Sequence, residues 1–156
     1  MGLKDQLHKD MQTAAKERNS LALSALRMAV AAVRNREIDA VTRKEMPKGA
    51  TLPEEAVLKV IAAMVKQRRE SIGLFLQGNR PELAAKEESE IVVLERYLPK
   101  ALTPGEIEAA VREAIAESGA RLSSDMGRVM KALMPKVAGR ADGKAVSETV
   151  RRLLAG

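Results

Sequence analysis

The segment from Asp125 to Lys144 holds the residue types that could do chemistry, and the chemistry they suit is anion binding. It contains three Met, three Gly and five Lys or Arg, without any Cys, His or aromatic residue. Lys and Arg side chains beside glycine-rich backbone can hold phosphate groups. The sequence therefore suggests what kind of surface this segment presents, and it does not identify a reaction.

The same segment begins as an amphipathic helix. At about 100° per residue, its apolar side chains share one side, while Arg128 and Lys131 point to the other. The apolar side is formed by Met126, Val129, Met130, Leu133 and Met134. We expect these methionines to fill gaps in the core and the two cations to face solvent. Pro135 and Gly139 should end this helix early.

Arg140 and Lys144 follow in a basic turn that leads into the last helix. Free backbone N–H groups at a helix N-terminus attract anions, so the two cations could complete a phosphate site there. The spacing is neither that of a P-loop nor that of a dinucleotide-binding fingerprint, and no strand precedes it. From the residues alone, RNA contact and a helical hairpin with a solvated charged face are about equally supported.

A second constellation combines Arg68 with Glu87 and Glu90. Helical spacing puts Arg68 on the apolar face of one predicted helix and both glutamates in the apolar stripe of the next. An unpaired buried charge is costly, so we expect Arg68 to meet Glu87 or Glu90 across the helix pair. A general acid and base is the alternative, but we favour a structural ion pair. His8 has no companion ligands, and the sequence predicts neither a metal site nor a cofactor.

Helices must position all of these groups. The chain has 156 residues, of which 46% are hydrophobic and 31% are charged, with one Tyr, one Phe and no Trp. Ala, Leu, Met, Glu, Lys and Arg dominate it, and all six favour helices. The composition therefore predicts a globular, all-α protein.

About seven helices are predicted, with four before and three after a boundary marked by Pro99 and Pro104. We place one domain at residues 1–98, where Pro99 ends the fourth helix, and a second domain of three helices at residues 99–156. The expected caps of helix starts are Ser20, Thr51 with Glu54, Thr103 with Glu106, and Ser124 or Asp125.

Three features bear on location. The chain has no cysteine, which excludes a disulfide framework. Its N-terminus is charged and lacks the apolar core of a signal peptide. No run approaches the roughly 20 apolar residues of a membrane span. We expect a soluble, cytoplasmic protein without a membrane partner, and we favour a monomer.

The net charge of +6 is unevenly distributed. From Arg121 to Gly156, eight Lys or Arg stand against three Asp or Glu, a net charge of +5. From Pro99 to Ala120, two stand against four, a net charge of −2. A basic excess confined to the last quarter of the chain favours a polyanionic partner such as RNA.

Two long motifs closely resemble the GatB/YqeY family. They are KQRRESIGLFLQGNRPELAAKEESEIVVLERYLP and DMGRVMKALMPKVAGRADGKAVSETVRRLL, and LRMAVAAVRNREI is also similar to the family. The resemblance covers nearly the whole chain and implies two small helical domains joined by a partly helical linker. The second domain is similar to the C-terminal tail of GatB in the aspartyl/glutamyl-tRNA amidotransferase, a tail that helps hold tRNA.

The resemblance also implies site residues. It carries over four positions of the tail pattern, Gly127, Gly139, Arg140 and Ala141, and the cations near them become candidates for phosphate contact. The predicted RNA-binding residues are Gly127, Arg128, Lys131, Lys136, Gly139, Arg140 and Lys144.

The leading interpretation is a tRNA-binding or tRNA-metabolism accessory protein. It would contact phosphate and RNA shape, because the basic domain offers no aromatic platform on which bases could stack. The family is associated with carbon–nitrogen ligase activity that uses glutamine as amido-nitrogen donor. The alternative is therefore a non-autonomous amidotransferase component, which would work with amidotransferase subunits or other translation-related proteins. We assign no catalytic residue, since no set of side chains supplies nucleophile, base and oxyanion donor. A protein-interaction adaptor is a further alternative.

Overall fold

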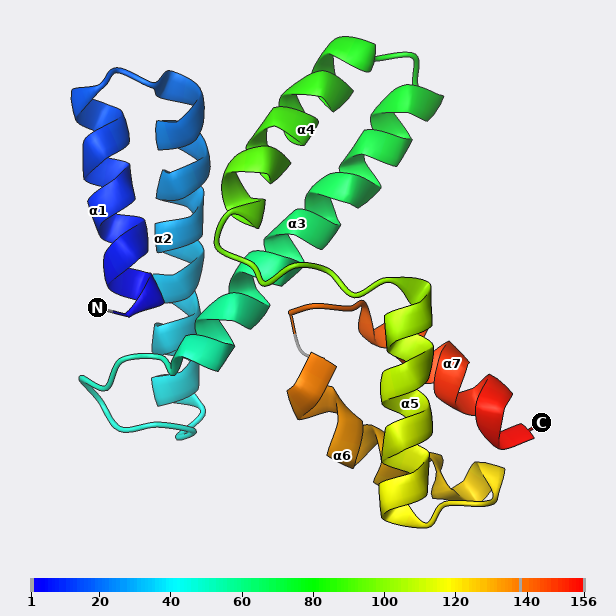
Figure 1. The fold of residues 1–156 in the computed structure, drawn as a ribbon. Coiled ribbons are helices and arrows are strands. Elements are labelled where there is room, and N and C mark those ends of the chain that lie inside the picture. The colour runs from blue at the N-terminus through cyan, green and yellow to red at the C-terminus, as the bar shows by residue number, and fades with distance from the viewer. Residues whose placement is uncertain (1, 138, 156) are drawn as a thin grey trace. The chain divides into compact units, whose positions relative to one another are not determined.

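The computed structural model describes residues 2–137 and 139–155, and over these residues every regular element is helical (Figure 1). This confirms the predicted all-α fold. The α-helices are α1 (Leu3–Lys16), α2 (Ser20–Thr42), α3 (Glu54–Gln77), α4 (Pro81–Glu95), α5 (Pro104–Ser118), α6 (Met126–Val137) and α7 (Gly143–Ala155), and a 3-10 turn, Ser123–Asp125, precedes α6.

The chain forms two compact units that divide between Leu98 and Pro99, which is where the prolines placed the boundary in the sequence. Each unit has its own hydrophobic core, built from separate sets of buried side chains. Among the described residues, no helix is both long enough and apolar enough to cross a membrane.

The first unit is organised around α2, which contacts α1, α3 and α4. Ala25 and Ala29 of α2 are fully buried, and their small side chains let the neighbouring helices approach closely. Leu7, Ile61 and Leu94 come from α1, α3 and α4 and are also fully buried. Each such side chain contributes roughly 2 kcal/mol of hydrophobic stabilisation.

The second unit packs α5, α6 and α7 against one another. Its fully buried side chains are mostly valines, with Leu133 of α6 among them. Met126, Met130 and Met134 are partly buried and pack against this core, which confirms the predicted methionine stripe. The start of α5 also forms as predicted, because the Thr103 hydroxyl accepts a hydrogen bond from the Glu106 N–H (3.2 Å).

Two other predicted caps are wrong. α2 is capped by Asn19, whose side-chain oxygen accepts from the Ala22 N–H at 3.2 Å, and Ser20 is already the first helical residue. α3 begins after Pro53 without a side-chain cap, so Thr51 and Glu54 form no capping box.

The reason for the second error lies outside the local sequence. The Glu37 carboxylate, on α2, accepts a hydrogen bond from the Leu52 N–H at 3.1 Å, and the Leu52 side chain is buried. This contact places residues 51–53 before the helix, so Thr51 is two positions too early to cap it.

The predicted ends of two helices also need correction. Pro135 lies inside α6, which continues to Val137, because a proline in the last turn costs only the hydrogen bond to the Lys131 carbonyl. Gly139, with φ of +76°, follows the end of α6. In the first unit, α4 ends at Glu95, before Pro99 is reached.

Candidate nucleic-acid interface

The basic side chains of the second unit divide into those that bind a carboxylate and those that do not. Three of the eight cations after Ala120 form ion pairs: Arg128 with Asp125 (3.0 Å), Lys136 with Glu117 (3.1 Å) and Arg152 with Glu108 (3.3 Å). The other five, which have no ion pair to a carboxylate of residues 2–137 or 139–155, are Arg121, Lys131, Arg140, Lys144 and Arg151.

Two of the paired cations, Arg152 and Arg128, face a carboxylate whose pKa is lowered. Hydrogen bonds from Arg112 and Arg152 hold the pKa of Glu108 below its usual range. Hydrogen bonds from the Arg121 and Leu122 N–H groups do the same to the pKa of Asp125. Arg112, Arg128 and Arg152 therefore sit beside full negative charges, which reduces their attraction for an external phosphate.

The contacts of Asp125 differ from the predicted role of a simple N-terminal cap of α6. Its carboxylate accepts from N–H groups at Arg121 (3.0 Å) and Leu122 (3.1 Å), which lie upstream of the 3-10 turn. The described contacts of Asp125 thus hold the approach to the turn, and the Ser123–Asp125 turn stands where the sequence predicted a simple cap by Ser124 or Asp125.

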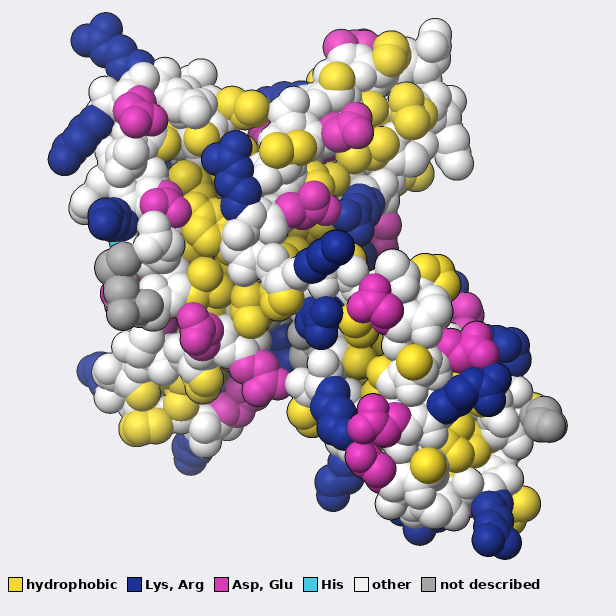
Figure 2. All heavy atoms as spheres, viewed as in Figure 1, with side chains coloured by type: hydrophobic (Ala, Val, Ile, Leu, Met, Phe, Trp, Pro, Cys, Tyr) yellow, Lys and Arg dark blue, Asp and Glu magenta, His cyan; other side chains and the backbone are white. Residues whose placement is uncertain are grey.

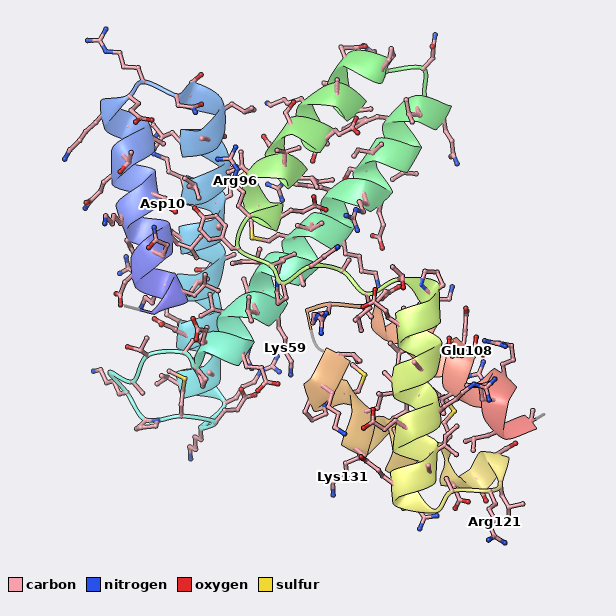
Figure 3. The ribbon with its side chains drawn as sticks, viewed as in Figure 1. Asp10, Lys59, Arg96, Glu108, Arg121 and Lys131 are labelled. Carbon is pink, nitrogen blue, oxygen red and sulfur yellow. The ribbon has the colours of Figure 1, made fainter. Side chains whose placement is uncertain are left out.

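Lys131 differs from the other predicted phosphate contacts on α6 because it has no ion pair within the described residues. It is exposed, and Figure 3 shows its side chain, like that of Arg121, extending away from the helices of the second unit. Arg128, three residues earlier, is also exposed but is paired with Asp125. Lys136 turns toward α5, because its ammonium group binds Glu117. The three cations of α6 are therefore not equivalent.

Arg140 has a structural contact of its own. Its Nε donates a hydrogen bond to the Lys100 carbonyl at 3.2 Å, and its own carbonyl accepts from the Leu102 N–H at 2.7 Å. These two bonds fasten residues 100–102 to the turn between α6 and α7. A substitution of Arg140 would therefore change the fold of this unit as well as its charge.

The N-terminus of α7 already holds a carboxylate. Oδ1 of Asp142 lies 3.5 Å from the Lys144 backbone nitrogen, and the Asp142 carbonyl accepts from the Val146 N–H at 3.1 Å. An anionic side chain at this end satisfies the helix dipole from within the chain. The exposed Lys144 side chain, rather than the backbone N–H groups, is the part of this region that is open to a phosphate.

The two glycines among the predicted site residues differ in whether the backbone requires a glycine. A Cβ at Gly127 would meet no atom within 4 Å, so the packing of the described residues does not require a glycine there. Gly139 has φ of +76°, a conformation that side-chain-bearing residues rarely adopt. Gly139 thus has a backbone role, and Gly127 has none within the described chain.

Of the seven predicted residues, four lie on α6, Gly139 and Arg140 lie on the following turn, and Lys144 lies on α7. Sequence reasoning also missed two exposed cations without carboxylate partners in the described chain, Arg121 and Arg151. Arg151 could have been found, because it lies seven residues after Lys144 and therefore on the same face of α7.

Arg68, in the first unit, lies between the two glutamates named with it. Its Nε is 3.0 Å from Glu90 and 3.9 Å from Glu87. Its other nitrogens donate to the Met64 carbonyl (3.4 Å) and to the Met28 sulfur (3.3 Å). Arg68 and Glu90 are both 5% exposed. This geometry suits an ion pair that joins α3 to α4, and it leaves little access for a substrate.

No group of three or more His, Cys, Asp or Glu residues in the described part of the chain is arranged to hold a metal ion.

Comparisons with known proteins bear on the whole chain. A family model described as Yqey-like protein matches residues 4–154. A protein of the yeast Lachancea thermotolerans is 32% identical over 113 residues, which cover 71% of this chain and 57% of the relative. A protein of Meyerozyma guilliermondii is 29% identical over 142 residues, which cover 91% of this chain and 67% of the relative. Both are named altered inheritance of mitochondria protein 41, mitochondrial.

The chain spans just over half the length of the first of these relatives, and 55% of a third one, from Vanderwaltozyma polyspora, which bears the same name. These names contradict the predicted cytoplasmic location, because they describe mitochondrial proteins. The absence of cysteine, on which that prediction rested in part, does not distinguish one reducing compartment from another.

Proposed function

Because this chain belongs to the Yqey-like protein family, we propose that it is a tRNA-binding accessory protein of tRNA metabolism whose contact surface is the basic second unit. The observation that carries the proposal is the set of five cations after Ala120 that have no carboxylate partner within the described residues. Four of them, Arg121, Lys131, Lys144 and Arg151, are exposed.

Exposed and unpaired cations are what a polyanion needs. A Lys or Arg that is already paired must give up its partner before it can bind phosphate, whereas an unpaired one releases only the counterions of the nucleic acid. The second unit contains no aromatic residue, so contacts go to phosphates and to RNA shape rather than to stacked bases.

The geometry decides which residues the test should change. Lys131 and Lys144 are exposed, lie on different elements and have no ion pair within the described chain, so charge reversal there leaves the fold intact. Arg140 is a poorer choice because its hydrogen bond to Lys100 would be lost as well. The test variant is Lys131→Glu/Lys144→Glu.

A matched control lies in the first unit. Lys9 and Lys16 of α1 are also exposed and have no ion pair within the described residues, so Lys9→Glu/Lys16→Glu makes the same change in net charge elsewhere. Both variants and the wild type are titrated with labelled total tRNA at several salt concentrations, with duplex DNA as competitor.

We expect tRNA affinity to fall at least about tenfold in the Lys131/Lys144 variant, and its slope against salt to decrease by about two. The Lys9/Lys16 variant should keep the wild-type slope. Equal losses in both variants would mean that only net charge matters, and unchanged binding in the test variant would remove α6 and α7 as the contact surface.

A further inference from the structure

A groove runs along the first unit between α1 and the end of α4. Both helices pack on α2, but they do not pack on each other over the described residues, and a hollow of about 520 Å³ lies between them. Figure 2 shows a channel with apolar side chains at its base, open along this face of the first unit. We propose that this groove binds an amphipathic helix of a partner protein. One flank of that helix carries cationic side chains and the other carries acidic side chains.

The wall on α1 has the spacing of a helix–helix interface. It is formed by Leu3, Gln6, Asp10, Thr13 and Glu17, which alternate at intervals of three and four residues. This spacing places them in one stripe along α1, about 21 Å long at 1.5 Å per residue. It is the period by which one helix meets another side by side.

This stripe holds α1 in the fold at Leu3, which packs against the core, and at Asp10, which accepts a hydrogen bond from Tyr97. Leu7 and Ala14 are buried and Met11 packs against the core, so that face of α1 is already covered. The rest of the groove stripe, at Gln6, Thr13 and Glu17, adjoins that face, and α4 does not pack along it within the described residues.

The floor of the groove is formed in part by small side chains. Ala14 and Ala22 line it, and neither carries more than a methyl group, so the backbone of an added helix can come close. Leu26 and Val93 are almost fully buried and supply the apolar surface beneath. A small ligand would be left largely open to water here, whereas small-molecule sites bury most of their ligand. The length and openness therefore favour a helix.

The charges on the two walls of the groove determine the charge pattern that a bound helix needs. Asp10 is already satisfied, because Tyr97 donates to one of its oxygens (2.5 Å) and Gln6 to the other (2.7 Å). The open charges are Glu17 on the α1 wall and Arg96 across the groove, both exposed and without an ion pair in the described residues. Figure 3 shows Arg96 between α2 and α4, across α2 from Asp10 on α1.

A helix in the groove would therefore meet a carboxylate on one flank and a guanidinium on the other. A nucleic acid does not match this pattern, because its phosphates would be attracted to Arg96 and repelled by Glu17. A helix with cations on one flank and carboxylates on the other does match. In one of its two orientations along the groove, its cations lie beside Glu17 and its carboxylates lie beside Arg96. This inference concerns the first unit and is independent of tRNA binding.

Three synthetic peptides test it. Each has about 20 residues and the same stripe of Ala and Leu; the flanks carry Lys on one side and Glu on the other, Lys on both sides, or Glu on both sides. Each is titrated at low salt into the full-length wild type, Glu17→Arg and Arg96→Glu. Binding is followed by fluorescence anisotropy and by amide NMR shifts of Ala22 and Val93, with Gly73 as a distant reference.

We expect the wild type to prefer the mixed peptide, Glu17→Arg to prefer the all-Glu peptide, and Arg96→Glu to prefer the all-Lys peptide. Each preference should be about threefold or more, as expected for exposed charges. The proposal is overturned if no peptide moves the Ala22 and Val93 signals, or if all three proteins rank the peptides alike. A concentration-dependent dimer that Glu17→Arg abolishes would also overturn it, because a second copy would then fill the groove.

Discussion

The Tyr97 hydroxyl donates a hydrogen bond of 2.5 Å to Oδ2 of Asp10, although the two residues are 87 positions apart in the sequence. The bond ties the first helix of the chain to the segment that follows α4. Burial raises the pKa of Tyr97, and the Asp10 carboxylate raises it further. The phenol therefore keeps its proton, and the hydrogen bond persists, well into alkaline conditions.

We expect Tyr97→Phe to lower the free energy of unfolding of the first unit by about 1–2 kcal/mol, since a hydrogen bond to a charged group is lost. Asp10→Asn, which keeps an acceptor for the hydroxyl, should cost less. Urea unfolding followed by far-UV circular dichroism measures both. A Tyr97→Phe protein as stable as the wild type would mean that water replaces the bond without loss.

The two carboxylates near Arg68 should differ in their effect on stability. Glu90→Gln leaves the buried guanidinium with Glu87 alone, at 3.9 Å, and should cost about 3 kcal/mol. Glu87→Gln should cost less than about 1 kcal/mol, because Glu87 is more exposed and farther away.

A double variant separates the charge from the packing. Arg68→Met/Glu90→Leu should be more stable than Glu90→Gln alone, because no buried charge is left without its partner. Urea midpoints give the order, and equal costs for the two single Gln variants would show that Arg68 does not distinguish its neighbours.

Glu37 should make the first unit sensitive to acid. Burial opposes its ionisation, but hydrogen bonds from Lys4 and from the Leu52 N–H outweigh burial and hold the pKa of Glu37 below its ordinary 4.5. A lowered pKa in the folded state stabilises the protein above the unfolded value and loses this contribution as the pH falls through the folded value.

The free energy of unfolding should therefore decline below about pH 4.5, and less steeply in Glu37→Gln than in the wild type. Urea midpoints between about pH 3 and pH 7 measure this. Parallel curves for the two proteins would assign the acid sensitivity to other carboxylates.

The two predicted glycines of the second unit should respond in opposite directions. Gly139→Ala forces a side chain into φ of +76° and should destabilise the unit by about 1 kcal/mol. Gly127→Ala lies within α6 with open space around it and should stabilise the unit by up to about 1 kcal/mol. Thermal unfolding by circular dichroism tests both, and the same sign for both would contradict the assigned roles.

Local spacing predicted much of this fold. The methionine stripe of α6 and the start of α5 at Thr103 follow from residues three and four apart, which is the range over which a helix repeats itself. The same spacing placed Arg68 and Glu90 on facing stripes of adjacent helices. The helical period within each segment is enough to place such side chains on a face, although Arg68 and Glu90 are 22 positions apart.

Other contacts between distant residues could not be predicted from helical spacing. The Leu52 N–H binds Glu37 instead of taking part in a cap with Thr51, and Arg140 binds the carbonyl of Lys100, 40 residues earlier. In the candidate interface, which cations stay unpaired depends on carboxylates such as Glu117, which lies 19 residues before Lys136. Composition located the basic region. Only the packing of α5 against α6 shows which of its cations are paired with a carboxylate and which are not.

The division into two cores has a consequence for spectroscopy. The single tyrosine and the single phenylalanine both lie in the first unit, and the chain has no tryptophan. Intrinsic fluorescence and near-ultraviolet signals therefore report only on the first unit, and the second unit can unfold or bind without changing them. A tryptophan placed at the exposed Leu122 would give the second unit an optical signal of its own.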